Sequence, residues 1–270
     1  MNAHTATARA ERIKPVHVGD HLREWRQRRH LSQLDLALEA GVSTRHLSFV
    51  ETGRSRPSPE MVLHLADQLD VPLRDRNQLL LAAGYAPRYA ERGLDEPEMA
   101  PVRDALDLVL RGHEPYPAIV VDRGWNMVAA NPPVALLTAG VAPELLEPPV
   151  NVLRVSLHPG GVAPRIANLG EWRAHLLERL GRQVALTGDE GLAALYDELE
   201  GYPAPDAAEV HDPLAGGIVV PLRLRTDGGE LAFFSTVTTF GTAVDITVAE
   251  LAVESFFPAD AATAEALRSR

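Results

Sequence analysis

The stretch SQLDLALEAGVSTRHLSFVETGRSRP, residues Ser32–Pro57, decides the fold of the first part of the chain. Ser32 and Ser43 stand where helix N-caps belong, because their hydroxyls can accept from the free amides of a first turn. A glycine follows each expected helix and can take the left-handed backbone of a helix stop. The pattern predicts helices over 33–40 and 44–52, in the spacing of a DNA-binding helix-turn-helix. The expected apolar seam between them consists of Leu34, Ala37, Val42, Leu47 and Val50.

Three further helices surround this pair. Apolar residues recur at helical spacing on both sides of it, and Ser58 is a further N-cap. We expect residues 17–84 to form an all-α, five-helix DNA-binding domain, preceded by a flexible N-terminus over 1–16. The three additional helices are predicted at 20–29, 59–69 and 72–84.

The charge of the chain is unevenly distributed. All 270 residues together carry a formal net charge of −11. Residues 1–92 hold 14 basic and 11 acidic side chains, a net charge of +3, so the remaining 178 residues carry −14. A basic segment followed by an acidic remainder agrees with nucleic-acid binding by the first part of the chain.

Composition excludes several classes of protein. The chain has no Cys, which excludes disulfides, thiolate zinc sites and cysteine nucleophiles. No run approaches the roughly 18 apolar residues of a membrane helix, and no signal-peptide pattern opens the sequence, so we expect a cytoplasmic, nucleoid-associated protein without a membrane partner. Nucleophile-elbow, zinc-helix and phosphate-loop motifs are missing and the ten His are scattered. We therefore expect no enzyme, no catalytic residue, no metal and no cofactor.

The rest of the sequence indicates an α+β domain. A linker is expected over 85–99 and a second domain over 100–270, beginning with a helix over 100–111 that buries Val102, Leu106 and Val109. Apolar β-formers between tight turns predict a five-stranded, mostly antiparallel sheet flanked by helices, an arrangement of PAS type. The longer helices are predicted at 166–186 and 191–200, and the strands at 118–121, 125–129, 218–225, 230–240 and 246–257.

Motifs in a fixed order carry a family resemblance. Gln33, Ala37, Gly41 and Glu51 are placed as in XRE (lambda-repressor-like) regulators, and the whole of 17–268 resembles the MmyB-like regulators in particular. The resemblance implies a transcriptional regulator whose PAS-like C-terminal domain binds a small apolar ligand such as a fatty acid. The motifs are TRHLSFVETGRSRPSPEMV, PLRDRNQLLLAAGYAP, YPAIVVDRGWNMVAAN, NVLRVSLHPGG, NLGEWRAHLLERL, YDELEGYP and ELAFFSTVTTFGTAVDITVAELAVESFFPAD.

The same resemblance gives the second helix of the motif an outward, base-reading face. Arg45 can donate two hydrogen bonds to guanine, and Phe49 can contact a thymine methyl group. For each Arg the alternative is a solvated surface charge, and for Phe49 it is a place in the core. The base-reading candidates are Thr44, Arg45, Ser48 and Phe49, and the phosphate candidates, which add affinity without sequence information, are Gln33, Arg26, Arg54 and Arg56.

A small-molecule pocket needs an apolar wall and a few polar groups. An arginine among the candidates can pair with an acyl carboxylate. The alternatives are core packing for the aromatic residues, a helix cap for Asn131 and a turn for His158. The wall candidates are Trp125, Met127, Trp172 and Phe233, with Leu176 and Phe256 beside them, and the polar candidates are Asn131, Arg154, His158 and Arg165.

The expected partners are double-stranded DNA, a small apolar ligand and a second copy of the chain. A homodimer would place two recognition helices about one helical turn (~34 Å) apart on a palindromic operator. Two alternatives stay open. In one the C-terminal domain is a protein-docking or dimerisation module, and in the more remote one it is an uncharacterised enzyme.

Overall fold

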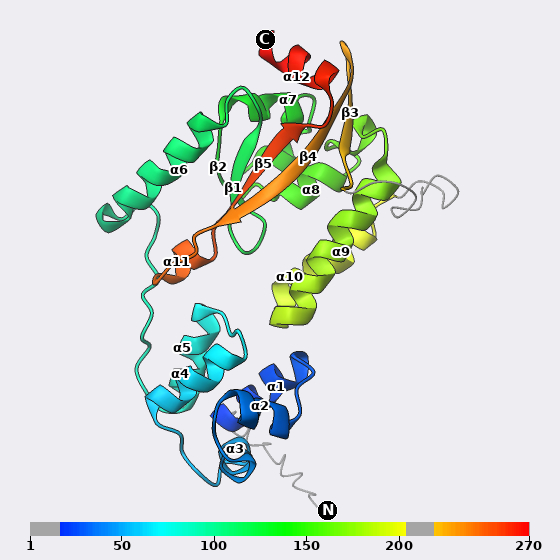
Figure 1. Ribbon diagram of the computed structural model, residues 1–270. Helices are drawn as coiled ribbons and strands as arrows, with labels where there is room; N and C mark the ends of the chain where they lie inside the picture. Colours follow the sequence, from blue (N-terminus) through cyan, green and yellow to red (C-terminus); the bar gives the residue numbers. More distant parts are fainter. Residues whose placement is uncertain (1–16, 204–218, 270) are drawn as a thin grey trace, which may run out of the picture. The chain divides into compact units, whose positions relative to one another are not determined.

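The computed structural model describes residues 17–203 and 219–269, which divide into two compact units (Figure 1). The first unit ends at Tyr89 and the second begins at Ala90. The expected flexible segment 1–16 and the start of the strand expected at 218–225 lie outside the described residues. Among the helices that the structure describes, none combines the length and the apolarity that a bilayer crossing requires.

The first unit consists of the five predicted helices. The hydroxyls of Ser32, Ser43 and Ser58 each accept from a backbone amide three residues on, which confirms the three expected N-caps. The helices are α1 (Val18–Arg28), α2 (Gln33–Glu39), α3 (Thr44–Glu51), α4 (Pro59–Gln68) and α5 (Leu73–Ala82).

One member of the expected apolar seam is on the outside. Ala37, Leu47 and Val50 are buried as predicted, whereas Leu34 is 56% exposed and Leu36 is buried in its place. The sequence offered two apolar stripes on α2, because every second residue from position 34 to 38 is Leu. The helix turns the stripe that contains Ala37 inward, where a small side chain lets the helices approach.

A buried ionic cluster joins α1, α2 and α3. The carboxylate of Glu51 accepts from Arg26 Nε at 2.7 Å and Nη2 at 2.9 Å, and from Gln33 Nε2 at 2.8 Å. Burial by itself raises the pKa of Glu51, but the hydrogen bonds from Arg26 and Gln33 and the charges of Arg26 and Arg23 hold it below its usual range. Gly19 of α1 lies so close to the end of α3 that a Cβ atom there would be 2.4 Å from Val50 O.

The second unit contains a five-stranded sheet, all of whose strand pairs are antiparallel, so the α+β prediction is confirmed. Along the sheet the strand order is β2-β1-β5-β4-β3, so the first hairpin lies next to the last strand. The strands are β1 (Ala118–Val121), β2 (Met127–Ala130), β3 (Leu222–Thr226), β4 (Gly229–Thr239) and β5 (Ala252–Pro258).

Each face of this sheet packs against helices. In β1, Ile119 and Val121 point into the larger core, whereas Ala118 and Val120 point toward α6. Figure 1 shows α6 on one side of the sheet and α8, α9 and α10 on the other. The helices are α6 (Ala100–Gly112), α7 (Ala135–Thr138), α8 (Val152–Leu157), α9 (Leu169–Thr187), α10 (Glu190–Glu200) and α12 (Ala261–Arg268), with 3₁₀ turns at Pro97–Met99, Pro132–Val134, Pro143–Leu146 and Ala163–Arg165.

Two details of the prediction for this unit are wrong. The strand expected over 246–257 begins only at β5, because Ile246–Ala249 forms a helical turn, α11, whose Thr247 amide is capped by Asp245 Oδ1 at 3.0 Å. On α6, Leu106 and Leu110 are buried and Val109 is 45% exposed. Residues four apart lie on the same face of a helix, so burial of Leu106 and Leu110 turns Val109 toward the solvent.

The segment that the sequence suggested as a linker is held at both ends. Asn77 of α5 donates to Tyr89 O at 2.8 Å within the first unit. In the second unit Arg92 Nη1 lies 2.9 Å from Asp245 Oδ2, and the amide of Ile246 donates to Ala90 O at 2.8 Å. The segment 85–99 is therefore divided between the two units, with the boundary after Tyr89.

Glu51→Gln should destabilise the first unit. The variant leaves Arg26 buried without its charged partner, so we expect the free energy of unfolding to fall by about 3 kcal/mol at neutral pH. Because the folded pKa of Glu51 is depressed, its ionisation stabilises the fold above the unfolded value of about 4.3 and loses this effect as the pH falls below it. The difference between wild type and variant should therefore narrow in acid.

Urea unfolding of the full chain, read by hydrogen exchange in peptides from residues 18–83, measures this difference. Glu39→Gln removes an exposed carboxylate of α2 and should change little. Equal stabilities of wild type and Glu51→Gln at pH 7 would contradict the structural role of the cluster.

Candidate DNA interface and ligand pocket

The outward face of α3 carries the four expected base-reading residues. Thr44 and Arg45 in the first turn are exposed, and Ser48 and Phe49 are partly exposed. Leu47 and Val50 point into the core, which fixes the opposite face of the helix outward. Two guanidinium groups lie near the Phe49 ring, with Arg45 Cζ 5.3 Å and Arg54 Cζ 5.8 Å from its centroid. This face therefore presents two cations and an aromatic ring.

The four phosphate candidates are placed very differently. Arg26 is buried against Glu51, so the expectation that it contacts phosphate is wrong. Gln33 is partly exposed, but its amide donates to the same carboxylate. Arg56 donates to Ala83 O at 3.1 Å and to Gly84 O at 3.3 Å, where it caps the end of α5. Arg54 is exposed beside Phe49 and is the candidate best placed for a phosphate.

Sequence reasoning missed the role of Glu51. The signal was present, because positions 47, 50 and 51 follow the helical spacing of one buried stripe, and an acidic residue on such a stripe needs a partner. Arg26, in the last turn of α1, is the partner of Glu51.

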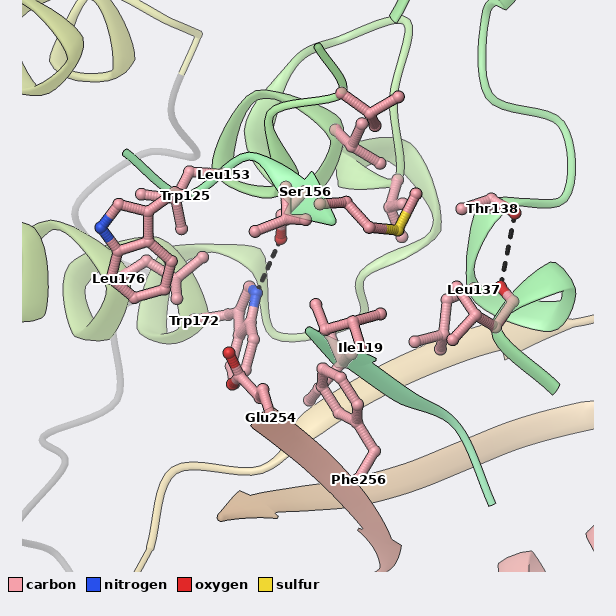
Figure 2. A pocket seen from close by; sticks show the side chains of 17 residues that line it. Ile119, Trp125, Leu137, Thr138, Leu153, Ser156, Trp172, Leu176, Glu254 and Phe256 are labelled. Atoms are coloured by element: carbon pink, nitrogen blue, oxygen red, sulfur yellow. Dashed lines mark hydrogen bonds between the residues drawn. The ribbon is translucent and has the colours of Figure 1, made fainter. Parts of the chain in front are cut away.

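The second unit contains an apolar cavity between the sheet and α7, α8 and α9. Figure 2 shows its wall, in which the side chains of Trp125, Trp172 and Phe256 border the same space. The volume of the cavity that is open to the centre of a water molecule is about 90 Å³. The lining residues are Ile119, Trp125, Met127, Val134, Leu137, Thr138, Val150, Val152, Leu153, Val155, Ser156, Val162, Trp172, Leu176, Leu222, Glu254 and Phe256.

The expected wall residues meet at this cavity with one exception. Trp125, Met127 and Trp172 line it. Trp125 has a left-handed backbone with φ 65°, and its indole Nε1 donates to Gln183 Oε1 at 2.8 Å, so its orientation is held by both main chain and side chain. Phe233 is fully buried and is not part of the lining, so core packing, the alternative weighed for it, describes its place.

None of the four expected polar residues lines the cavity. Arg154 binds Glu198 through Nε at 2.8 Å and Nη2 at 2.7 Å, and these hydrogen bonds lower the pKa of Glu198. Arg165 donates to Leu137 O, and burial lowers its pKa. His158 Nδ1 accepts from the Gly160 amide within a turn.

Asn131 closes the loop before the sheet. Its side-chain oxygen accepts from the amide of Ala118 at 2.9 Å, and its amide group donates to Leu110 O and Tyr116 O. It makes no side-chain cap bond to the following 3₁₀ turn, so the helix-cap interpretation is wrong as well.

The polar groups at the cavity are ones that the sequence did not single out. Trp172 Nε1 donates to Ser156 Oγ at 3.0 Å, as the dashed line in Figure 2 shows. Glu254 contributes a carboxylate from β5, which accepts from Ser235 Oγ at 2.8 Å. An acidic residue inside the apolar run LAVESFFP was the available signal. Among residues 17–203 and 219–269 no three His, Asp or Glu are grouped to hold a metal ion.

Two family models match the chain, one in each unit. A helix-turn-helix model matches residues 22–75, and a model described as the MmyB-like transcription regulator ligand binding domain matches residues 102–269. No curated protein matches the sequence.

The two matches agree with the geometry of the two units. The first falls on the helices that present Thr44 and Arg45, and the second spans the sheet and helices that enclose the apolar cavity. Since the ligand-binding model covers more than half of the residues, the chain belongs to the MmyB-like transcription regulators, with a DNA-binding helix-turn-helix followed by a ligand-binding domain.

Proposed function

We propose that the protein is a homodimeric, cytoplasmic regulator that reads a palindromic operator with α3 and senses a small apolar ligand, such as a fatty acid, in the cavity of its second unit. The observation that carries the sensing part is the cavity itself, because its lining is almost entirely apolar and includes two indoles and Phe256. Occupancy changes operator affinity only if the ligand prefers one arrangement of the protein.

We propose two domains for this function. The DNA-binding domain begins at residue 17, and the ligand-binding domain begins near residue 100. A PAS-like architecture for the second unit is supported by its antiparallel order β2-β1-β5-β4-β3 and by the helices that cover the cavity side of the sheet.

DNA reading is assigned to the exposed side chains of α3. The exposure of Arg45 supports its assignment to a bidentate contact with guanine, and Thr44, Ser48 and Phe49 are assigned to the same face. Arg54, exposed beside Phe49, is proposed to bind phosphate and to contribute affinity that depends on salt but not on sequence.

Arg45→Ala should change the base preference of the protein. We expect a loss of about 1–3 kcal/mol in operator binding and a relaxed preference at one position of each half-site, because one bidentate contact is removed. In vitro selection of randomised duplexes with the full chain, followed by affinity measurement, tests both effects. Arg111→Ala, on α6 of the second unit, is the matched control with an exposed side chain. Identical selected sequences for wild type and Arg45→Ala would exclude Arg45 as a base-reading residue.

Val134→Phe should fill the cavity and abolish ligand binding. Val134 is buried and lines the cavity, so the added ring occupies space that the ligand would use. Protein purified without delipidation and denatured in organic solvent should release an apolar molecule from wild type and from Val244→Phe, an exposed control, but not from Val134→Phe. Saturating wild type with that molecule should change its operator affinity and leave the affinity of Val134→Phe unchanged.

The sensing proposal fails if wild type releases no such molecule and shows no thermal shift with C8–C18 fatty acids. Its regulatory part alone fails if ligand binds but operator affinity stays the same.

A further inference from the structure

One charged group borders the cavity of the second unit among the residues that the structure describes. Among the described residues that line it, Glu254 is the one with an ionisable side chain, and it is 5% exposed. Its carboxylate rises from β5 toward Trp172 (Figure 2). The other lining side chains with polar atoms are Thr138, Ser156 and the two indoles.

Glu254 keeps room for one more hydrogen-bond donor. Oε1 accepts from Ser235 Oγ at 2.8 Å and lies 3.3 Å from Arg179 Nη1, and Oε2 lies 3.4 Å from the same nitrogen. A carboxylate has about four acceptor positions, so these three contacts do not fill it. It can accept from a ligand and, as a carboxylate, it cannot donate.

The cation that accompanies Glu254 does not border the cavity. The guanidinium of Arg179 lies 4.4 Å from the centroid of the Trp125 ring and is absent from the lining. The titratable groups that surround this pair on α9, namely His175, Glu178 and Arg182, are also outside the lining. Arg179 offsets the charge of Glu254 itself, but a negatively charged ligand group would find no second cation among the described lining residues to pair with.

Ser156 complements the carboxylate. Its oxygen accepts from Trp172 Nε1 at 3.0 Å, which leaves its own proton to be donated. Thr138, in contrast, already donates its hydroxyl proton to Val134 O at 3.3 Å. The polar groups of the wall thus suit a neutral group that can both donate and accept.

We propose that the ligand is a hydrocarbon chain that carries a neutral hydrogen-bond donor, such as a hydroxyl, at the end that meets Glu254. The inference rests on the proposed apolar-ligand function and concerns the chemistry of the polar end alone. It narrows the ligand class proposed above, because the ionised carboxylate of a fatty acid at that end would face the anion of Glu254 in an apolar enclosure.

Binding of three ten-carbon probes to the full chain tests this assignment. Decan-1-ol, decanoate and decane are compared at pH 7.5 by calorimetry and by the fluorescence of the tryptophans, two of which line the cavity. We expect decan-1-ol to bind at least about tenfold more tightly than decanoate and more tightly than decane. Glu254→Gln should narrow the difference between alcohol and carboxylate, because the amide removes the negative charge and can itself donate.

Glu230→Gln, which neutralises a more exposed carboxylate paired with Arg223 on the neighbouring strands, is the matched control and should keep the wild-type order. The comparison of the three probes is made with the wild-type protein, so it tests the proposal even if Glu254→Gln does not fold.

Decanoate binding as tightly as decan-1-ol to wild type would overturn the inference and leave the apolar-ligand function intact. Binding of none of the three probes would overturn both. An alcohol preference that survives unchanged in folded Glu254→Gln would overturn the role of Glu254.

Discussion

The buried carboxylate of Glu51 is the interaction on which the DNA-binding unit depends. It sits at the end of α3 and takes hydrogen bonds from Arg26 of α1 and from Gln33 at the start of α2. Three helices are thereby joined at one point, while Leu47 and Val50 fix the inward side of α3. The exposure of Thr44 and Arg45 follows from this arrangement, because a helix that is packed on one side presents its opposite side to the solvent.

Local chemistry was readable from the sequence, and long-range pairing was not. Ser32 and Ser43 cap helices because each hydroxyl accepts from a backbone amide only three residues further along the chain. A stretch of three or four residues therefore contains the whole signal. Arg26 looked like a phosphate ligand for the opposite reason. Its partner is 25 residues away, and nothing in the neighbouring residues distinguishes a buried guanidinium from a solvated one.

The same distinction explains what was found of the cavity. Trp125 and Trp172 were identified because large aromatic residues on amphipathic elements face a core, and here the core encloses a space. Arg154 was predicted to bind a ligand because of its charge, but it forms an ion pair with Glu198, 44 residues away. The strand expected from 246 onward shows a third limit, since Asp245 caps a helical turn where β-branched residues suggested a strand.

β5 links the cavity to the first residues of the second unit. It carries Glu254 and Phe256, both in the cavity wall, and it follows directly on α11. At the start of α11, Asp245 holds Arg92, and the amide of Ile246 binds Ala90 O. Under the proposed function a ligand must distinguish two arrangements of the protein. These bonds connect β5, and with it Glu254 and Phe256 of the cavity wall, to residues 90–92 at the start of the second unit, so under the proposed function this strand is the part of the wall that is joined to the chain leading to the DNA-binding unit.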